Sequence, residues 1–337
     1  MSDPQQRRIL LARQPSGPLS ADDFLLDTTP VPDPGPGQTL CRNLLLSIDP
    51  AARAWMSGPT YRDQLEVGEV IAGYTLAEVV RSDVDELAPG TIVATQGGWQ
   101  EYALVDTTTL RPISGRGSLE DRVSVLGVTG LTAYFGLVRV GRPEAGQTVV
   151  VSAAAGATGS VVGQLARTLG CRVVGVCGSR AKADFLRDEL HFDAVVDHHT
   201  DDLRAALAAA CPDGVDVYFD NVAGRVLTSV LPLMNTHGVI VSCGSVSAYD
   251  GEQPASLRAL PGLIVTRRLR MEGFLVHDFE DEWEQGEEFL AAELESGRLT
   301  SVHDVYDGLE RAPEALIDLL AGGNIGKRLV RIASEEG

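Results

Sequence analysis

Residues 148–166 constrain the fold more than any other part of the chain. Residues 148–151 predict a buried strand, residues 152–155 a tight turn of small side chains, and residues 156–166 a helix that opens on Gly156 and Gly159. The free N–H groups at a helix N-terminus attract anionic oxygens, and glycine lets the backbone approach them. This segment therefore predicts a pyrophosphate site, although Ala154 stands where the usual fingerprint has its first glycine.

A second apolar run, residues 171–177, predicts the neighbouring parallel strand of a βαβ unit. A site for NAD would place Asp or Glu near the end of this strand, to accept the ribose hydroxyls. This strand instead runs into Ser179, Arg180 and Lys182, whose donors and positive charge suit the 2′-phosphate of NADP. The alternative is an exposed turn with two solvated cations.

Lysine is scarce, and its positions exclude two other nucleotide sites. Lys182 and Lys327 are the only lysines in the sequence, and glycine stands four residues before each of them. The Tyr-x-x-x-Lys pair of short-chain dehydrogenases is therefore absent. Lys327 does not belong to a Walker loop either, because Arg328 replaces the Ser or Thr that would hold magnesium.

Charge and length narrow the class of protein. A chain of 337 residues, 44% of them hydrophobic, can bury a large core and is expected to form two domains. A net charge of −19 argues against nucleic acid or an anionic membrane as a partner. Residues 1–10 have no apolar core of signal-peptide length, and no apolar run is long enough to span a bilayer, so a cytoplasmic protein is expected.

The metal-binding residue types are scattered. Five cysteines, at positions 41, 171, 177, 211 and 243, form no C-x-x-C pair and predict neither a disulfide framework nor a zinc knuckle. Of the six histidines only His198 and His199 are neighbours in sequence, and adjacent side chains point apart on most backbones. No metal site is expected.

The chain is organised in three stretches. Residues 1–118 carry short apolar segments separated by Pro/Gly turns, which predicts a β-rich, barrel-like domain. Residues 119–299 alternate strands and helices, which predicts a doubly wound parallel sheet in an α/β domain. Residues 300–337 return to a strand, a helix and a final strand that is expected to rejoin the first domain. The expected elements of the last two stretches are strands at 192–196, 215–219, 239–243, 269–276, 302–306 and 328–332, and helices at 181–189, 202–210, 280–295 and 312–320.

Several short motifs in order along the chain carry a family resemblance. They are found at residues 46–56, 98–102, 130–136, 155–164, 219–224, 243–245, 271–274 and 323–327. With these motifs the chain resembles the zinc-independent prostaglandin reductase/2-alkenal reductase group of the medium-chain dehydrogenases/reductases. The resemblance implies a GroES-like substrate domain, residues 1–118 and 300–337, and a Rossmann NADP-binding domain, residues 119–299.

The resemblance also implies a set of NADP contacts. It places the pyrophosphate on Gly156, Ala157, Thr158 and Gly159, and the 2′-phosphate near Lys182. The remaining contacts would fall on Asn221, Cys243, Gly244, Ser245, Phe274 and Asn324. His198 stands where relatives often have Tyr, and two interpretations stay open for it: a cofactor contact or a solvated loop histidine.

On the substrate side, Tyr61 and Tyr249 are the candidates. Tyr249 precedes a loop that contains Pro254 and resembles the substrate loop of the family, and its phenol could donate to a substrate carbonyl or enolate as the catalytic group. The alternative is a tyrosine partly buried at a domain edge. Asp49 and Glu69 are interpreted as structural carboxylates rather than as a catalytic pair.

Zinc-containing relatives have Gly-His-Glu where this chain has Gly68 and Glu69 without a histidine, which implies metal-free chemistry. The expected reaction is NADPH-dependent reduction of the C=C bond of α,β-unsaturated aldehydes or ketones, by hydride transfer to the β-carbon. Water or a ribose hydroxyl would return the proton. An NADPH:quinone oxidoreductase and a non-catalytic NADPH-binding sensor are the alternatives. A homodimer that pairs the apolar strand 269–276 across a twofold axis is also expected.

Overall fold

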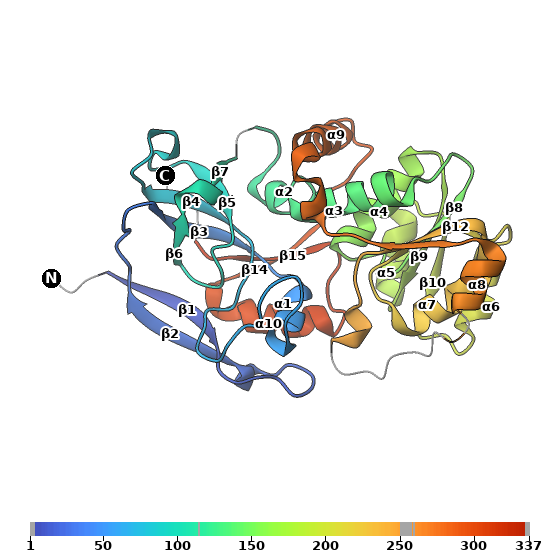
Figure 1. Cartoon of the computed structure of the whole chain (residues 1–337), viewed down its shortest axis with the longest axis horizontal. Coiled ribbons are helices and arrows are strands. Elements are labelled where there is room, and N and C mark those ends of the chain that lie inside the picture. The colour runs from blue at the N-terminus through green and yellow to red at the C-terminus, as the bar shows by residue number, and fades with distance from the viewer. Residues whose placement is uncertain (1–3, 114, 250–257, 259, 334–337) are drawn as a thin grey trace. The chain divides into compact units, whose positions relative to one another are not determined.

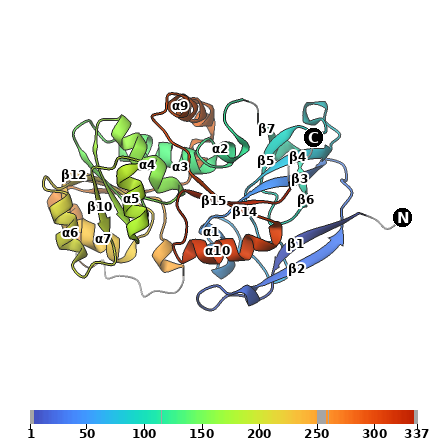
Figure 2. The ribbon, with the colours of Figure 1, turned by 180° about the vertical axis from the view of Figure 1, so that it is seen from behind.

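The computed structural model describes residues 4–113, 115–249, 258 and 260–333. The chain divides into two compact units, one made of Met1–Val123 with His303–Gly337 and the other of Ser124–Val302. The C-terminal segment therefore belongs to the same unit as the N-terminal one. Figure 1 and Figure 2 label most of the helices and strands of both units.

The unit Ser124–Val302 is built on a six-stranded parallel sheet. Its strands are β8 (Thr148–Val151), β9 (Arg172–Cys177), β10 (Ala194–Asp197), β11 (Val215–Asp220), β12 (Met234–Ser242) and β13 (Arg270–Gly273). Their order in the sheet is β10-β9-β8-β11-β12-β13. The chain winds outward from β8 to β10 and then crosses to the other side of β8, so the sheet is doubly wound, as predicted.

Helices cover both faces of this sheet, as a parallel sheet requires. They are α3 (Val128–Phe135), α4 (Ala157–Thr168), α5 (Arg180–Asp188), α6 (Leu203–Ala210), α7 (Gly224–Val230), α8 (Leu260–Arg267) and α9 (Trp283–Glu295), with the shorter turns η4 (Gly136–Gly141), η5 (Leu231–Leu233), η6 (Val246–Ala248) and η7 (Val276–Glu282). Successive side chains of β8 face opposite layers: Val149 and Val151 lie in one core with α3, α4, α5 and α9, and Val150 lies in another with α6 and α7.

The other unit is a mostly antiparallel β structure. Its strands are β1 (Gln5–Leu11), β2 (Phe24–Pro30), β3 (Gln38–Ser47), β4 (Thr75–Arg81), β5 (Ile92–Thr95), β6 (Tyr102–Asp106), β7 (Arg111–Pro112), β14 (His303–Asp307) and β15 (Lys327–Arg331). Its helices are α1 (Ala51–Ser57), α2 (Leu119–Val123) and α10 (Ala312–Leu320), with the turns η1 (Ala21–Asp23), η2 (Asp85–Leu87), η3 (Thr107–Thr109) and η8 (Leu309–Arg311). The main sheet has the order β14-β15-β3-β4-β5-β7, β6 also pairs with β3, and β1 pairs with β2.

The last strand of the chain completes this sheet. β15 lies antiparallel to β3, with Leu329 opposite Ser47, and parallel to β14. The parallel pair needs a crossover connection, which α10 supplies between β14 and β15.

Two predicted strands have different bounds in the structure. The strand expected at 239–243 begins five residues earlier, at Met234, because polar residues around His237 hide a β-segment with a shifted register. The strand expected at 269–276 ends at Gly273. The Asp278 carboxylate accepts a hydrogen bond from the Leu275 N–H at 2.9 Å, which starts a helical turn directly after β13.

Candidate cofactor site and substrate residues

The turn after β8 leads directly into α4, as the sequence predicts. Gly156 is the N-cap residue with an extended backbone, and within the described part of the chain no side chain caps this helix. The first N–H groups of an uncapped helix lack partners in the helix and are available to an anion. The N-terminus of α4 therefore fits a pyrophosphate.

Ala154 stands where the fingerprint has its first glycine, and the preceding residue, Ala153, makes the tight turn. Ala153 adopts the left-handed region at φ 48°, and the buried Ala154 donates its N–H to the Val176 carbonyl at 3.0 Å, which ties the turn to β9. The glycine at 159 is required, because a Cβ there would lie 2.4 Å from the Ala153 carbonyl oxygen. Two of the three fingerprint glycines are thus sufficient for the close approach of turn and helix.

The residues predicted for the 2′-phosphate share the first turn of α5. Ser179 is the N-cap residue, and its hydroxyl accepts a hydrogen bond from the Lys182 N–H. The Arg180 side chain is 94% exposed, with Asp184 at 3.6 Å, whereas Lys182 is half-buried. This helix N-terminus combines a hydroxyl and two cations, which fits a phosphate dianion.

His198 lies at the same edge of the sheet, after β10. A Cβ at Gly178 would come within 2.6 Å of His198 Nε2, so the imidazole lies against the backbone at the end of β9. Its ring centroid is 4.0 Å from that of His199. Burial, followed by the charge of His199, lowers the pKa of His198, so that the ring is neutral at pH 7.

Asn221 follows β11, the strand beside β8. Its backbone N–H donates to Ser152 Oγ at 2.8 Å, and its side-chain Nδ2 donates to the Ser152 carbonyl at 2.8 Å. The strand order changes direction between β8 and β11, and ligands of doubly wound sheets bind at such a point, beyond the carboxyl ends of the strands. Asn221 therefore lies where the second half of a dinucleotide is expected.

The turn at 243–245 follows the next strand, β12. The N–H groups of Cys243 and Gly244 donate to the Asp220 carbonyl at 2.9 and 3.0 Å. The half-buried Tyr249 follows this turn at the end of η6, where its backbone N–H donates to the Val246 carbonyl at 3.1 Å. Burial, reinforced by the Cys243 thiol, raises the pKa of Tyr249 and keeps its phenol protonated at neutral pH. Pro254, in the expected substrate loop, lies outside the described residues.

Phe274 directs its ring into the core of this unit. A Cβ at Gly136 would lie 2.5 Å from Phe274 Cζ, and the ring centroid is 6.3 Å from that of Phe279. The aromatic side chain therefore packs on the end of α3. It helps to hold the segment after β13.

Two predicted residues belong to the other unit. The Tyr61 side chain is 57% exposed and meets Trp55 edge-on, with 6.2 Å between ring centroids. Trp55 lines a hollow of about 370 Å³ together with Arg62 and Glu69. Asn324 is buried in the turn before β15 and donates from Nδ2 to the Gly326 carbonyl at 2.9 Å.

Asp49 and Glu69 each have a partner of their own. Asp49 forms an ion pair with the buried Lys327 and accepts a hydrogen bond from Ser47. Glu69 accepts the Glu66 N–H at 2.9 Å. These separate contacts support structural roles.

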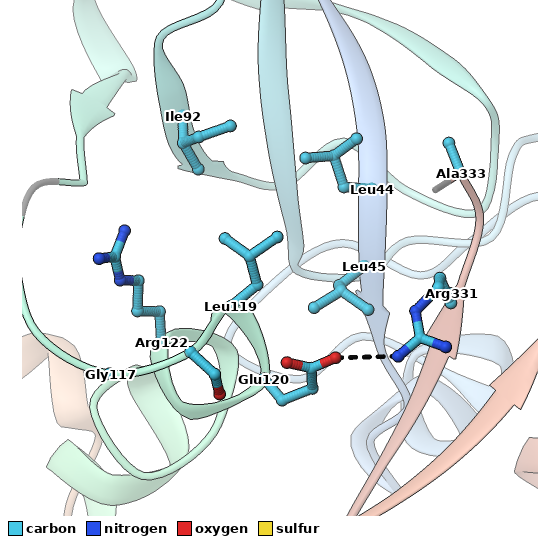
Figure 3. Close-up of a pocket in the computed structure, with 10 residues that line it drawn as sticks. Leu44, Leu45, Ile92, Gly117, Leu119, Glu120, Arg122, Arg331 and Ala333 are labelled. Atoms are coloured by element: carbon cyan, nitrogen blue, oxygen red, sulfur yellow. Dashed lines mark hydrogen bonds and ion pairs between the residues drawn. The ribbon is translucent and has the colours of Figure 1, made fainter. Parts of the chain in front are cut away.

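A larger cavity, of about 600 Å³, lies in the same unit and contains none of the predicted site residues (Figure 3). Leu44, Leu45, Ile92 and Leu119 line it, and an ion pair of Glu120 with Arg331 at 2.9 Å borders it. Arg331 also pairs with Asp307 at 2.9 Å. Arg122, which also lines the cavity, donates to the carbonyls of Gly115 and Arg116. Both arginines of this cavity are thus engaged by protein groups.

Comparisons with known proteins find matches in both units. Residues 7–113 match a family model described as the N-terminal domain of oxidoreductase, and residues 157–292 match one described as zinc-binding dehydrogenase. The NADPH-dependent curcumin reductase of Escherichia coli (strain K12) is 37% identical, and the match covers 98% of each chain. The NADP(+)-dependent 2-alkenal reductase of Nicotiana tabacum is 40% identical over 89% of each chain.

A solved structure resembles this chain in both sequence and fold. The crystal structure of CurA from Vibrio vulnificus has a TM-score of 0.94 and 36% identity, covering 98% of this chain and 100% of that one. The same protein in complex with NADPH gives a TM-score of 0.93, also at 36% identity, over 97% of this chain and 99% of that one. The chain belongs to the zinc-independent double-bond reductases of the medium-chain dehydrogenase/reductase superfamily.

In the described ranges of this reductase, no three His, Cys, Asp or Glu side chains lie together so that they could hold a metal ion. Nor does any helix of the described ranges have the length and apolar character needed to cross a bilayer.

Three residues of the reductase that the sequence analysis did not select bear on this site. Ser152 and Asp220 join the ends of β8 and β11. Arg225, at the start of α7, donates to the carbonyls of His198, Thr200 and Asp201 at 2.9, 2.7 and 3.1 Å, and so holds the loop that carries His198. Their positions could have pointed to them. Ser152 and Asp220 directly follow predicted strands, and Arg225 lies at the start of the helix after Asp220.

Proposed function

We propose that this reductase uses NADPH to reduce the C=C bond of α,β-unsaturated aldehydes and ketones. The observation that carries the proposal is the uncapped N-terminus of α4 beside the cationic N-terminus of α5, in a chain similar along its whole length to a curcumin reductase and a 2-alkenal reductase. (+)-Pulegone reductase of Mentha piperita, which is also named for an enone, is 35% identical over 98% of this chain.

The predicted residues after each strand bind a different part of the cofactor. The pyrophosphate is held by Gly156, Ala157, Thr158 and Gly159. The 2′-phosphate is bound by Ser179, Arg180 and Lys182, and His198 contacts the cofactor from the end of β10. Asn221, Cys243, Gly244, Ser245, Phe274 and Asn324 contact the remaining parts of the cofactor. NADPH supplies the hydride that reaches the β-carbon.

Tyr249 is the catalytic residue of this proposal. Hydride addition moves the electron pair of the C=C bond toward the carbonyl oxygen, which becomes an enolate oxygen. A neutral phenol donates a hydrogen bond to that oxygen. A tyrosine with the ordinary pKa of 10 is neutral at pH 7, and burial raises the pKa of Tyr249 further. Water or a ribose hydroxyl then returns a proton to the α-carbon. Tyr61 contacts the substrate.

The product distinguishes this reaction from its alternatives. With a deuterium-labelled NADPH and an enone, we expect a saturated ketone with deuterium at the β-carbon. An allylic alcohol, with deuterium at the carbonyl carbon, would refute the proposal. Reduction of quinones alone would favour a quinone oxidoreductase. That alternative has less support, because the quinone oxidoreductase of Escherichia coli is only 19% identical and shares the fold alone.

The protein is further proposed to be a homodimer. β13 is an edge strand with a single neighbour in the described sheet, and Met271 and Leu275 expose 38% and 40% of their surfaces there. Pairing of β13 with its symmetry mate would satisfy the unpaired edge. Light scattering at micromolar concentration should give twice the chain mass of 35.8 kDa, whereas a monomer mass would contradict the dimer.

A cytoplasmic location is proposed from the cysteines. All five are free thiols, and four of them are buried. Unpaired thiols persist in a reducing compartment. Fractionation of cells that express the tagged protein tests this location.

A further inference from the structure

Asp220, at the end of β11, is a buried carboxylate with an unusual concentration of donors. Its side chain is 2% exposed. Oδ1 accepts four hydrogen bonds, from the Ser152 hydroxyl at 3.1 Å, the Tyr218 phenol at 2.8 Å, the Val222 N–H at 3.0 Å and the Ala223 N–H at 2.8 Å. All four donors are neutral, and burial raises the pKa of Asp220. Within the described residues this carboxylate has neutral hydrogen-bond partners and no cation in an ion pair. A buried charge of this kind costs free energy of folding, and we therefore consider a functional role for it.

Through these bonds Asp220 joins the ends of three neighbouring strands. Ser152 follows β8, Asp220 ends β11, and the Asp220 carbonyl accepts the N–H groups of Cys243 and Gly244 after β12. These are the strand ends beyond which the second mononucleotide half of the cofactor is expected. The adenosine end is expected on the other side of β8, at β9 and α5.

The same network orients Asn221 and the turn that follows. Asn221 binds Ser152 through both its backbone N–H and Nδ2, and Ser152 is itself held by Asp220. Ala223 has φ 62° and ψ −143°, a conformation that alanine rarely adopts, and its N–H is bonded to Asp220. The Asp220 carboxylate thus compensates a strained turn directly behind Asn221.

We infer that Asp220 is a positioning residue, which holds Asn221 and the Ser152 end of β8 in the geometry that binds the nicotinamide half of NADPH. This inference rests on the proposed function, because it takes NADPH as the ligand. It assigns Asp220 no contact with substrate or cofactor.

The isosteric variant Asp220→Asn tests this inference by direct binding. We expect the Kd of NADPH, measured by fluorescence titration without an enone, to rise about tenfold, because a displaced Asn221 loses one hydrogen bond to the nicotinamide half. The Kd of adenosine 2′,5′-bisphosphate, which carries only the adenosine end, should stay within twofold. The melting temperature without ligand is measured beside these values to show that the variant is folded.

Asp216→Asn is the matched control on the same strand. Asp216 lies near the opposite end of β11, where its carboxylate accepts the Thr148 N–H and the Asn235 amide, each at 2.8 Å. This change should leave both Kd values within twofold.

Ser152→Ala is the second variant. It removes the hydroxyl that joins Asp220 to the Asn221 N–H, without changing a charge, and leaves the bond from Asn221 Nδ2 to the backbone carbonyl of residue 152. It should raise the Kd of NADPH severalfold and spare the bisphosphate, so the inference remains testable if Asp220→Asn does not fold. An unchanged Kd of NADPH, or an equal loss of affinity for both ligands, would overturn the inference. A wild-type protein that binds NADPH but reduces no enone would refute the proposed function alone.

Discussion

Ser179 Oγ accepts a hydrogen bond from the Lys182 N–H at 3.3 Å, which places both residues on the first turn of α5. The Ser179 hydroxyl and the Lys182 side chain therefore lie at the same helix N-terminus, where the helix dipole also favours an anion. The preference for NADPH over NADH is expected to arise here.

Lys182→Ala should therefore raise the KM for NADPH about tenfold to a hundredfold and leave that for NADH unchanged, because only NADPH carries the 2′-phosphate. Steady-state kinetics with both cofactors measures the difference. Arg187→Ala is the control: Arg187 lies on the last turn of the same helix and pairs with Asp184 at 3.1 Å. Equal losses with both cofactors would contradict the assignment of Lys182.

Tyr249→Phe should lower kcat about tenfold to a hundredfold with little change in the Kd of NADPH, because the phenol donates to an oxygen that becomes charged only during hydride transfer. The measurement combines enone turnover with cofactor titration. Tyr306→Phe, in β14, is the control, since that ring packs under Arg311 and Arg328. A variant at position 249 with wild-type kcat would remove Tyr249 from the mechanism.

His198 should make the fold sensitive to acid. Its pKa in the folded protein lies below the ordinary value of 6.5, so the unfolded chain binds the proton more tightly. Stability is therefore unaffected above pH 6.5 and falls as the pH is lowered from 6.5 through the folded-state pKa. His198→Gln should reduce this loss.

The measurement is the melting temperature of wild type and variant between pH 5 and 8. His199→Gln, which removes only the second cause of the lowered pKa, should reduce the loss of stability by less. Parallel pH profiles for wild type and His198→Gln would show that the imidazole does not titrate as described.

Exhaustive chelation should leave activity intact, and elemental analysis should find no stoichiometric zinc. The physical basis is the sequence at Gly68 and Glu69, which lacks the histidine of zinc-containing relatives. One zinc per chain, removed together with activity, would contradict a metal-free mechanism.

The local parts of the site could be read from the sequence because they depend on residues close together in the chain. A strand, a turn of small residues and a helix that opens on glycine are specified by 19 consecutive residues, 148–166, and the structure has β8 and α4 there. The helix predicted at 312–320 is α10, Ala312–Leu320, for the same reason. The alternation of strands and helices likewise predicted the doubly wound sheet.

The contacts between strand ends were decided only by the tertiary structure. Ser152 and Asp220 are 68 residues apart, and they meet because β8 and β11 are neighbours in the sheet. The His198 ring lies against Gly178 because β10 and β9 end side by side, and the Phe274 ring packs on Gly136 because the end of α3 lies against the segment after β13. Propensity and periodicity act over a few residues, whereas strand order is set by which apolar faces pack together across the whole sheet. The sequence alone therefore determined which strand ends carry the candidate site, and the packing of the sheet decided which side chains meet there.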